Sequence, residues 1–134
     1  CMQLREYTTY CESEILRLYA SVGWTAYTDD PAALREGFAH SLLTIAAYED
    51  EALAGLVRVV GDGATIVLVQ DLLVAPEYQR KGIGRALLQA VLDRYRAVRQ
   101  LQLVTDDTEK TLAFYKSMGF AESAAFGCRG MMLA

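Results

Sequence analysis

The residue types best suited to chemistry gather in one short segment, Gln79-Arg80-Lys81-Gly82-Ile83-Gly84-Arg85. The segment opens a stretch with apolar residues at helical spacing, so it lies where a helix begins. The first turn of a helix has unpaired backbone N–H groups and the positive end of the helix dipole, and both attract anions. Glycines allow a phosphate to approach the backbone closely. The segment therefore predicts a site for a small anion.

Two common phosphate loops are excluded by the same residues. The P-loop pattern G-x-x-x-x-G-K-[ST] is absent, and a dinucleotide-binding fingerprint needs a third glycine where Leu87 stands. Without further residues, an ordinary strand–turn–helix corner with a solvated basic turn explains the segment about equally well.

The surrounding residues resemble the GNAT superfamily of N-acetyltransferases. The family motif (Gln/Arg)-x-x-Gly-x-(Gly/Ala) is matched by Gln79, Gly82 and Gly84, and it follows the family-like strand Asp71-Leu-Leu-Val-Ala-Pro76. A later family motif is similar to the stretch from Thr111 to Phe120, with Phe114-Tyr115 at its centre. The motifs stand in the family's order, so the resemblance implies transfer of an acetyl group from acetyl-coenzyme A to an amine.

The resemblance also implies which residues hold the cofactor. The turn would bind the pyrophosphate, and the backbone of the strand before it would pair with the pantetheine arm. Thr108 stands where many relatives carry an asparagine that contacts the cofactor. The expected cofactor-binding residues are Leu72, Leu73, Val74, Gln79, Arg80, Lys81, Gly82, Ile83, Gly84, Arg85, Thr108, Phe114 and Lys116. No metal ligand set is expected.

Tyr115 is the candidate general acid, since a phenol can protonate the departing thiolate of coenzyme A. The alternative is a core aromatic side chain at helical spacing with Leu112 and Met118. Asp71 is the candidate base, acting directly or through water, because it interrupts an otherwise apolar strand. A structural Asp71 that accepts backbone N–H groups is an equally good interpretation.

The amine pocket is expected at Trp24, Tyr27 and Gln70, because aromatic faces hold aryl groups and attract cations. An aromatic staple onto the sheet is the alternative for the first two. A pairing of Arg58 with Asp62 across the hairpin is one option, and a solvated or structural role is favoured over catalysis for these two residues. Scattered residues, among them Gly23-Trp24, are similar to the branch of plant and cyanobacterial serotonin N-acetyltransferases, so a small aryl-alkyl amine or a polyamine is the expected acceptor. A protein or peptide amine and a non-catalytic acyl-CoA sensor are the alternatives.

The predicted architecture is a mixed α/β fold, a sheet of six to seven strands flanked by about four helices, in one domain over residues 1–134. Helices are expected over Glu12–Val22, Pro31–His40, Gly84–Ala97 and Glu109–Met118. The expected strands are Met2–Tyr7, Leu43–Glu49, Leu53–Val60, Ala64–Val74, Leu101–Val104, Phe120–Ala125 and Arg129–Leu133, with a tight turn at Gly61-Asp62-Gly63.

Net charge, apolar runs and cysteine count limit the kinds of partner and the cell compartment to be expected. The 134 residues carry a net charge of −4, which disfavours a nucleic-acid partner. No apolar run approaches the roughly 18 residues of a membrane span. Three cysteines without paired spacing favour free thiols and a cytoplasmic protein. A homodimer is an assembly that the family resemblance allows.

Overall fold

The computed structural model describes residues 1–134, which divide into two compact units, 1–102 and 103–134. The first unit contains strands β1 (Met2–Glu6), β2 (Leu43–Glu49), β3 (Ala52–Gly61) and β4 (Ile66–Val74), and helices α1 (Glu12–Ser21), α2 (Thr25–Thr28), α3 (Pro31–Ala39) and α4 (Ile83–Arg94), with the 3₁₀ turn η1 (Pro76–Tyr78). Strand β5 (Gln100–Leu103) leads into the second unit, which contains α5 (Glu109–Ser117) and the 3₁₀ turn η2 (Ser123–Phe126).

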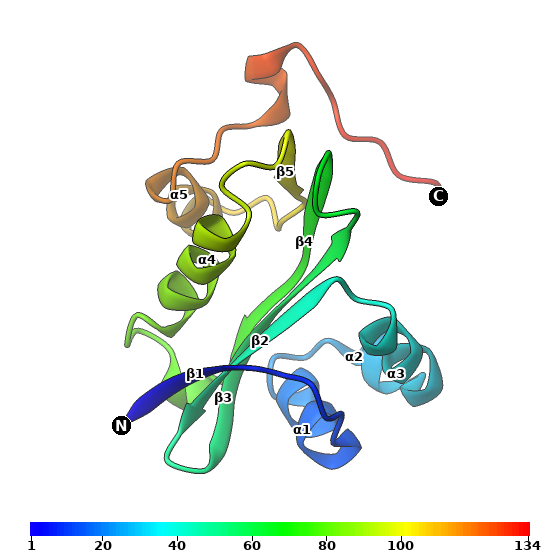
Figure 1. The fold of residues 1–134 in the computed structure, drawn as a ribbon, viewed down its shortest axis with the longest axis vertical. Helices are drawn as coiled ribbons and strands as arrows, with labels where there is room; N and C mark the ends of the chain where they lie inside the picture. Colours follow the sequence, from blue (N-terminus) through cyan, green and yellow to red (C-terminus); the bar gives the residue numbers. More distant parts are fainter. The chain divides into compact units, whose positions relative to one another are not determined.

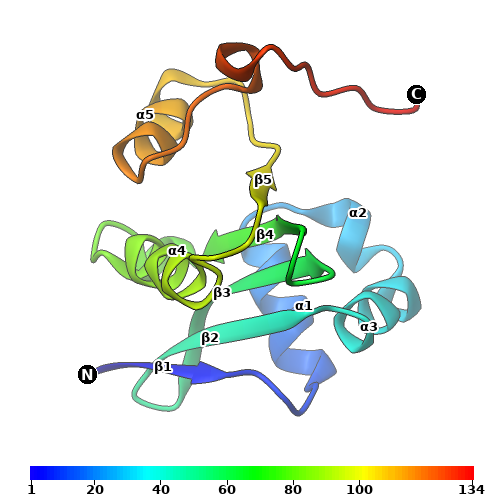
Figure 2. The same cartoon turned by 45° about the horizontal axis from the view of Figure 1, so that its top comes forward.

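The sheet has the strand order β1-β2-β3-β4-β5, and the first four strands form an antiparallel meander. The N–H groups of Arg99 and Gln100 donate to the carbonyls of Ala64 and Thr65, which starts the last pairing. Helices α1 to α3 cover one face of the meander and α4 covers the other (Figures 1 and 2). The expected mixed α/β architecture is present, with five strands instead of six to seven.

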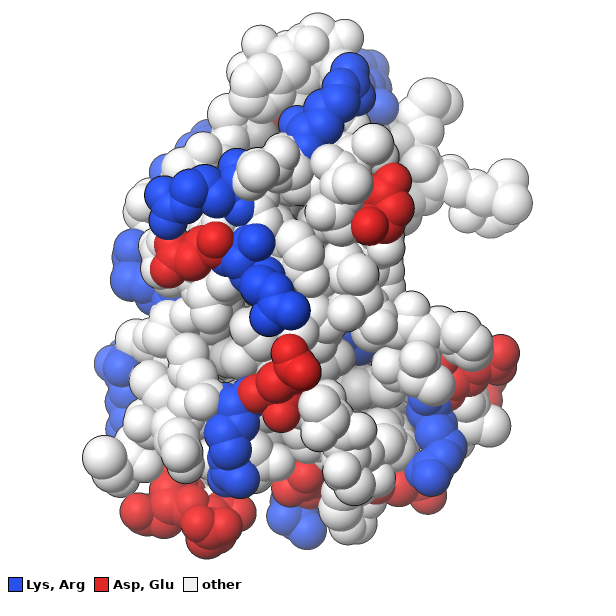
Figure 3. All heavy atoms as spheres, in the orientation of Figure 1, with Lys and Arg blue, Asp and Glu red and all other residues white.

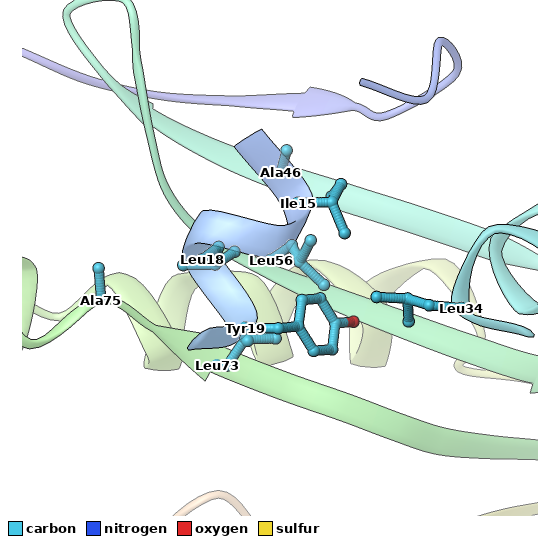
Figure 4. Close-up of a cluster of buried hydrophobic side chains, with 8 residues drawn as sticks. All are labelled: Ile15, Leu18, Tyr19, Leu34, Ala46, Leu56, Leu73 and Ala75. Carbon is cyan, nitrogen blue, oxygen red and sulfur yellow. The ribbon is translucent and has the colours of Figure 1, made fainter. Parts of the chain in front are cut away.

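The core under α1 forms because Ile15, Leu18 and Tyr19 recur at helical spacing and so share one helix face. Each is at most 2% exposed. They pack against residues of α3 and of the central strands (Figure 4). The buried cluster consists of Ile15, Leu18, Tyr19, Leu34, Ala46, Leu56, Leu73 and Ala75.

A β-bulge at Gln70 changes which face of the sheet the residues of β4 occupy. Val69 is paired with Val59, but Asp71 is paired with Arg58, so Gln70 is the extra residue. Directly paired residues share a face and successive residues alternate. Val69 and Asp71 therefore lie on opposite faces although they are two residues apart. The bulge places Asp71 and Arg58 on the face covered by α1 to α3.

Two local predictions concern the start of α3 and the connection from β3 to β4. The start of α3 is confirmed: the Asp30 side chain accepts a hydrogen bond from the N–H of Ala33, and Pro31 is the first helical residue. The connection from β3 to β4 is longer than the predicted tight turn, because β4 begins only at Ile66. The Asp62 carboxylate organises it by accepting hydrogen bonds from Ala64, Thr65 and Ile66.

The two predicted C-terminal strands, Phe120–Ala125 and Arg129–Leu133, are wrong. A strand needs a partner for its backbone groups, and here the backbone closes on itself in short turns such as Cys128 N–H to Ser123 O. The apolar residues of the second segment are exposed, and Met131 is 91% exposed. Helix α5 ends as predicted, with Gly119 in the left-handed conformation just beyond it.

Candidate active site

The turn before α4 has the backbone that an anion site needs. Gly82 is the N-cap of α4 with φ +80°, and no side chain caps the helix there. The first intrahelical hydrogen bond runs from the N–H of Ala86 to the carbonyl of Gly82, so the N–H groups of Ile83 and Gly84 precede the helical ladder. Arg80 also has a positive φ of 65°, which is uncommon for a residue with a side chain. The turn is thus held in a specific, partly strained conformation.

Side-chain contacts fix this turn to the end of β4. Nε2 of Gln79 donates to the carbonyl oxygen of Val74 at 3.0 Å. Nζ of Lys81 lies 5.6 Å from the ring centroid of Tyr78. Arg80, Lys81 and Arg85 are all exposed, and basic side chains are visible along the side of the first unit where α4 lies (Figure 3). The predicted phosphate-binding residues therefore come together at one helix start.

The strand segment predicted to meet the pantetheine arm lies directly before this turn. Leu72 and Val74 are half-buried, and Leu73 is buried in the core beneath α1. The three residues are paired with Val57, Leu56 and Gly55 of β3 along one edge of β4. These three residues are therefore held in the sheet by β3, and their contribution to cofactor binding through the backbone stays a prediction.

Asp71 is a buried carboxylate with three side-chain donors. It is 2% exposed. Its Oδ1 accepts from the Tyr27 hydroxyl at 2.7 Å, and its Oδ2 accepts from the Tyr19 hydroxyl and from Nε of Arg58, both at 2.8 Å. The structural interpretation of Asp71 predicted backbone donors, whereas the observed donors are side chains from α1, α2 and β3.

The cation in this cluster, Arg58, is 5% exposed. Its Nη1 donates to Oγ of Ser41 at 3.1 Å, and its guanidinium lies over the ring of Phe38 at 5.3 Å from the centroid. Arg58 pairs with Asp71 and not with Asp62, the partner suggested from the sequence. The bulge at Gln70 sets the register so that Arg58 faces Asp71, while Asp62 is used within its own turn.

The three residues predicted for the amine pocket lie next to one another. Nε2 of Gln70 donates to the Tyr27 hydroxyl at 3.2 Å. The Trp24 and Tyr27 ring centroids are 6.2 Å apart, and Trp24 also packs edge-on against Tyr19. Trp24 and Tyr27 are half-buried and Gln70 is exposed. The aromatic-staple interpretation is therefore correct in part: Trp24 packs against Tyr19 of α1. Gln70 beside these rings is exposed.

Burial controls the ionisation of the two tyrosines that contact Asp71. Removal from water raises the pKa of Tyr19, and the adjacent Asp71 carboxylate raises it further. Burial also raises the pKa of Tyr27, against an opposing effect of the hydrogen bond from Gln70. Both phenols are therefore neutral at physiological pH, and each holds its hydrogen for donation to Asp71.

In the second unit, the residues of the later motif lie on α5. The Thr108 hydroxyl caps the helix by accepting from the N–H of Thr111 at 3.2 Å. The Tyr115 ring packs edge-on against Phe114 and Phe120. Burial raises the pKa of Tyr115, opposed by a hydrogen bond with Thr105. Lys116 is exposed and forms an ion pair with Glu122 at 3.2 Å.

Two residues of the Asp71 cluster, Tyr19 and Arg58, were not predicted as its partners. Tyr19 reads as an ordinary core position of α1. Arg58 carried a usable signal, because it interrupts an apolar strand just as Asp71 interrupts the next strand. Buried charges are paired, so two opposite charges in consecutive apolar strands are candidates for one another.

Two further properties bear on the class of protein. No helix combines the length and the apolar character that crossing a membrane requires. No group of three or more His, Cys, Asp or Glu side chains is arranged to hold a metal ion.

The fold and the site define a class: an α/β protein in which a glycine-containing basic turn starts a helix directly after a central strand. A family model described as the acetyltransferase (GNAT) family matches residues 9–120. The chain therefore belongs to the GNAT acetyltransferase family.

Similar proteins support this assignment. A GNAT family acetyltransferase of Streptococcus pneumoniae TIGR4 has a solved structure with a TM-score of 0.91, at 38% identity over 100% of this chain and 98% of that one. The ribosomal protein bS18-alanine N-acetyltransferase of Escherichia coli K12 is 39% identical over 71 residues, which are 51% of this chain and 46% of that protein. A chloroplastic GCN5-related N-acetyltransferase 2 of Arabidopsis thaliana is 32% identical over 62% of this chain and 32% of its own length. The chain thus spans less than half of these two curated relatives.

One solved structure supports the fold alone. The PaiA N-acetyltransferase of Thermoplasma acidophilum, in complex with coenzyme A, has a TM-score of 0.73 at 16% identity, with 91% of each chain covered.

Proposed function

We propose that this protein transfers the acetyl group of acetyl-coenzyme A to a primary amine by direct attack in a ternary complex. The observation that carries the proposal is the uncapped start of α4 at Gly82, with exposed Arg80 and Lys81 beside it, in a chain of the GNAT family. Unpaired N–H groups and positive charge at a helix start suit the pyrophosphate of coenzyme A. The coenzyme A complex of the similarly folded PaiA protein is consistent with this.

In the proposed reaction the amine nitrogen bonds to the acetyl carbon, the carbon–sulfur bond breaks, and coenzyme A leaves as a thiolate. Tyr115 supplies the proton that converts this thiolate into a thiol. An acid must be in its protonated form, and burial keeps the Tyr115 phenol neutral by raising its pKa. The amine must lose a proton before or during attack, and for an alkyl amine with a pKa near 10 this costs roughly 4 kcal/mol at pH 7.

Asp71 acts on the amine only by way of Tyr27, because the carboxylate itself is buried and already accepts three hydrogen bonds. Protonating Asp71 would leave Arg58 buried without its anion, at about 3–5 kcal/mol. That cost is about the same as the cost of losing the amine proton to water, so proton transfer to Asp71 would gain little. We therefore assign Asp71 a positioning role, with a base role through Tyr27 as the alternative that the pH dependence tests.

The acceptor is proposed to be a small amine, aryl-alkyl or polyamine, held near Trp24, Tyr27 and Gln70. The partly exposed aromatic rings of Trp24 and Tyr27 support an aryl group. The second candidate is the amine of a peptide, which the similarity to the bS18-alanine N-acetyltransferase favours.

The experiment is a thiol-release assay with acetyl-coenzyme A and a panel of amines: serotonin, tryptamine, spermidine, a lysine peptide and a peptide with a free N-terminal alanine. Turnover with a small amine supports the first candidate, and turnover restricted to peptides supports the second. A thermal-shift comparison of acetyl-coenzyme A with ATP and NAD tests the cofactor, since a ligand stabilises the folded state by RT ln(1 + [L]/Kd). Stabilisation by ATP without stabilisation by acetyl-coenzyme A would refute the proposal.

A further inference from the structure

The side chain of Gln79 connects the turn that starts α4 back to the end of β4. Its Nε2 donates to the carbonyl oxygen of Val74 at 3.0 Å. The loop between the two residues is folded by backbone hydrogen bonds, from the N–H of Tyr78 to the carbonyl of Ala75 and from the N–H of Gln79 to the carbonyl of Pro76. The Gln79 side chain therefore adds a direct link across a loop whose own shape the backbone already determines.

The Val74 carbonyl lies on the edge of β4 that faces away from β3. The N–H of Ala75 donates to the carbonyl of Ala54 at 2.8 Å, so these two residues form a hydrogen-bonded pair. In an antiparallel ladder such pairs alternate with non-hydrogen-bonded pairs, and the next pair, Val74 with Gly55, is of the second kind. The Val74 carbonyl therefore has no acceptor role in the ladder with β3, and the amide of Gln79 donates to it instead.

Close packing against β3 limits the movement of this part of β4. A Cβ added at Gly55 would lie 2.7 Å from the carbonyl oxygen of Leu73 and 3.3 Å from Cα of Val74, so the two strands approach each other closely here. On the opposite edge, the Val74 carbonyl is held by Gln79. Gln79 directly precedes Arg80, the residue with the strained φ of 65°. The hydrogen bond thus joins a tightly packed strand end to the strained part of the turn.

We propose that Gln79 is a positioning residue whose side chain sets the spacing between the end of β4 and the turn at Gly82. The proposal rests on the proposed function, in which the turn binds the pyrophosphate of acetyl-coenzyme A and the backbone of β4 binds its pantetheine arm. A ligand that spans both places binds more tightly when their spacing is already set, because less of the protein has to be ordered on binding. A ligand that reaches only the turn gains no such advantage.

The test compares two ligands by calorimetric titration of the full chain. One is acetyl-coenzyme A, and the other is 3′-phospho-ADP, the nucleotide end of coenzyme A without the pantetheine arm. Gln79→Met removes the N–H donor and keeps a side chain of similar length. We expect its Kd for acetyl-coenzyme A to rise about fivefold, the ratio that corresponds to one hydrogen bond of ordinary net strength. The Kd for the nucleotide should stay within about twofold, because the backbone hydrogen bonds of the turn remain.

Two further variants separate positioning from general effects. Gln89→Met is the matched control, since it removes an exposed hydrogen bond of 2.9 Å from a glutamine of α4 to Asp93. It should change neither Kd, although it should lower the melting temperature about as much as Gln79→Met. Gln79→Arg is the conservative variant, because a guanidinium also carries N–H donors. Its added charge acts on both ligands alike, so the ratio of the two Kd values should stay near that of the wild type.

Three results would overturn the positioning role: Gln79→Met leaves both Kd values unchanged, it weakens both ligands equally, or Gln79→Arg changes the ratio as much as Gln79→Met does. With a wild type that releases thiol from acetyl-coenzyme A, these results would leave the acetyltransferase function intact. A wild type that does not bind acetyl-coenzyme A would refute both the positioning role and the proposed function. Selective loss of acetyl-coenzyme A affinity in Gln79→Met, in a protein that acetylates no amine, would support the positioning role and refute the transfer.

Discussion

Nε of Arg58 lies 2.8 Å from Oδ2 of Asp71, and neither residue is more than 5% exposed. The two residues are directly paired across β3 and β4. Two tyrosines complete the shell of the carboxylate, so the charge pair is satisfied by hydrogen bonds as well as by its own attraction. This buried pair is expected to stabilise the first unit. Asp71 also accepts a hydrogen bond from Tyr27, which lies where the amine is expected to bind.

Removing the cation should be costly. We expect Arg58→Met to lower the free energy of unfolding by about 3–5 kcal/mol in urea titration, because Asp71 would remain buried without a counter-charge. The double variant Arg58→Met/Asp71→Leu should lose less than the sum of the two single variants. Arg94→Met is the control, since it removes an exposed ion pair with Glu6 at 3.7 Å and should cost less than about 1 kcal/mol. Equal costs for the two arginines would contradict this account.

Asp71→Asn tests whether Asp71 positions or removes a proton. We expect kcat/KM for the amine to fall about tenfold or more, because the neutral amide no longer fixes the Tyr27 hydrogen. The acidic limb of the pH–rate profile should keep its position, since it reports the ionisation of the amine itself, and it should move when an amine of lower pKa is used. Loss of the acidic limb in the variant would instead identify Asp71 as the base.

Tyr115→Phe should separate chemistry from cofactor binding. We expect kcat to fall roughly 100-fold, the lower end of what a general acid contributes, while the Kd for acetyl-coenzyme A stays within about threefold. Because burial raises the pKa of Tyr115, the wild-type enzyme should lose no activity from its deprotonation up to about pH 10. Tyr95→Phe, at the end of α4, is the control with both constants unchanged. A kcat near the wild-type value in Tyr115→Phe would exclude the acid role.

Gly82→Ala should weaken acetyl-coenzyme A binding through the backbone of the turn. An added Cβ meets no atom within 4 Å, so the effect comes only from the φ of +80°, and the cost to folding is about 1–2 kcal/mol. Gly127→Ala is a matched control, with φ +74° and equally open surroundings. Both variants should unfold at lower urea concentration, but only Gly82→Ala should reduce the thermal shift given by acetyl-coenzyme A. The same loss in both would show that the turn has no part in binding.

Acid should weaken the turn between β3 and β4 through Asp62. Hydrogen bonds from the Thr65 hydroxyl and from the N–H groups of Ala64, Ile66 and Thr65 hold the pKa of Asp62 well below its usual range. A lowered folded-state pKa gives stability that is present above the unfolded value, about 3.9, and is lost as the pH falls below it. The melting temperature of Asp62→Asn should therefore drop less between pH 7 and pH 3 than that of the wild type. Parallel drops would contradict the prediction.

Local features were predicted well because local residues determine them. The start of α3 at Pro31, the start of α4 one residue from the predicted Gly84 and the end of α5 one residue from the predicted Met118 each depend on the conformational preferences of one or two residues. The turn from Gln79 to Arg85 is also local: it lies at the start of α4 as expected, and its binding of a phosphate stays a prediction. The family motif likewise lies in contiguous sequence.

The C-terminal strands failed for the opposite reason. The consecutive apolar residues Met131, Met132 and Leu133 suit a strand, but a strand exists only where another segment accepts its hydrogen bonds. The backbone around Ser123 and Cys128 makes its hydrogen bonds within a turn. The segment therefore has no partner strand.

The sequence by itself determined the family and the glycine-containing turn at the start of α4, which is predicted to bind an anion. The tertiary structure decided how the residues around Asp71 cooperate. One extra residue in β4, Gln70, shifts the register so that Arg58 faces Asp71. Tyr19, 52 residues before Asp71, then donates to the same carboxylate. Register and long-range contact depend on how distant segments pack, and a one-residue bulge changes neither composition nor periodicity enough to be visible in the sequence.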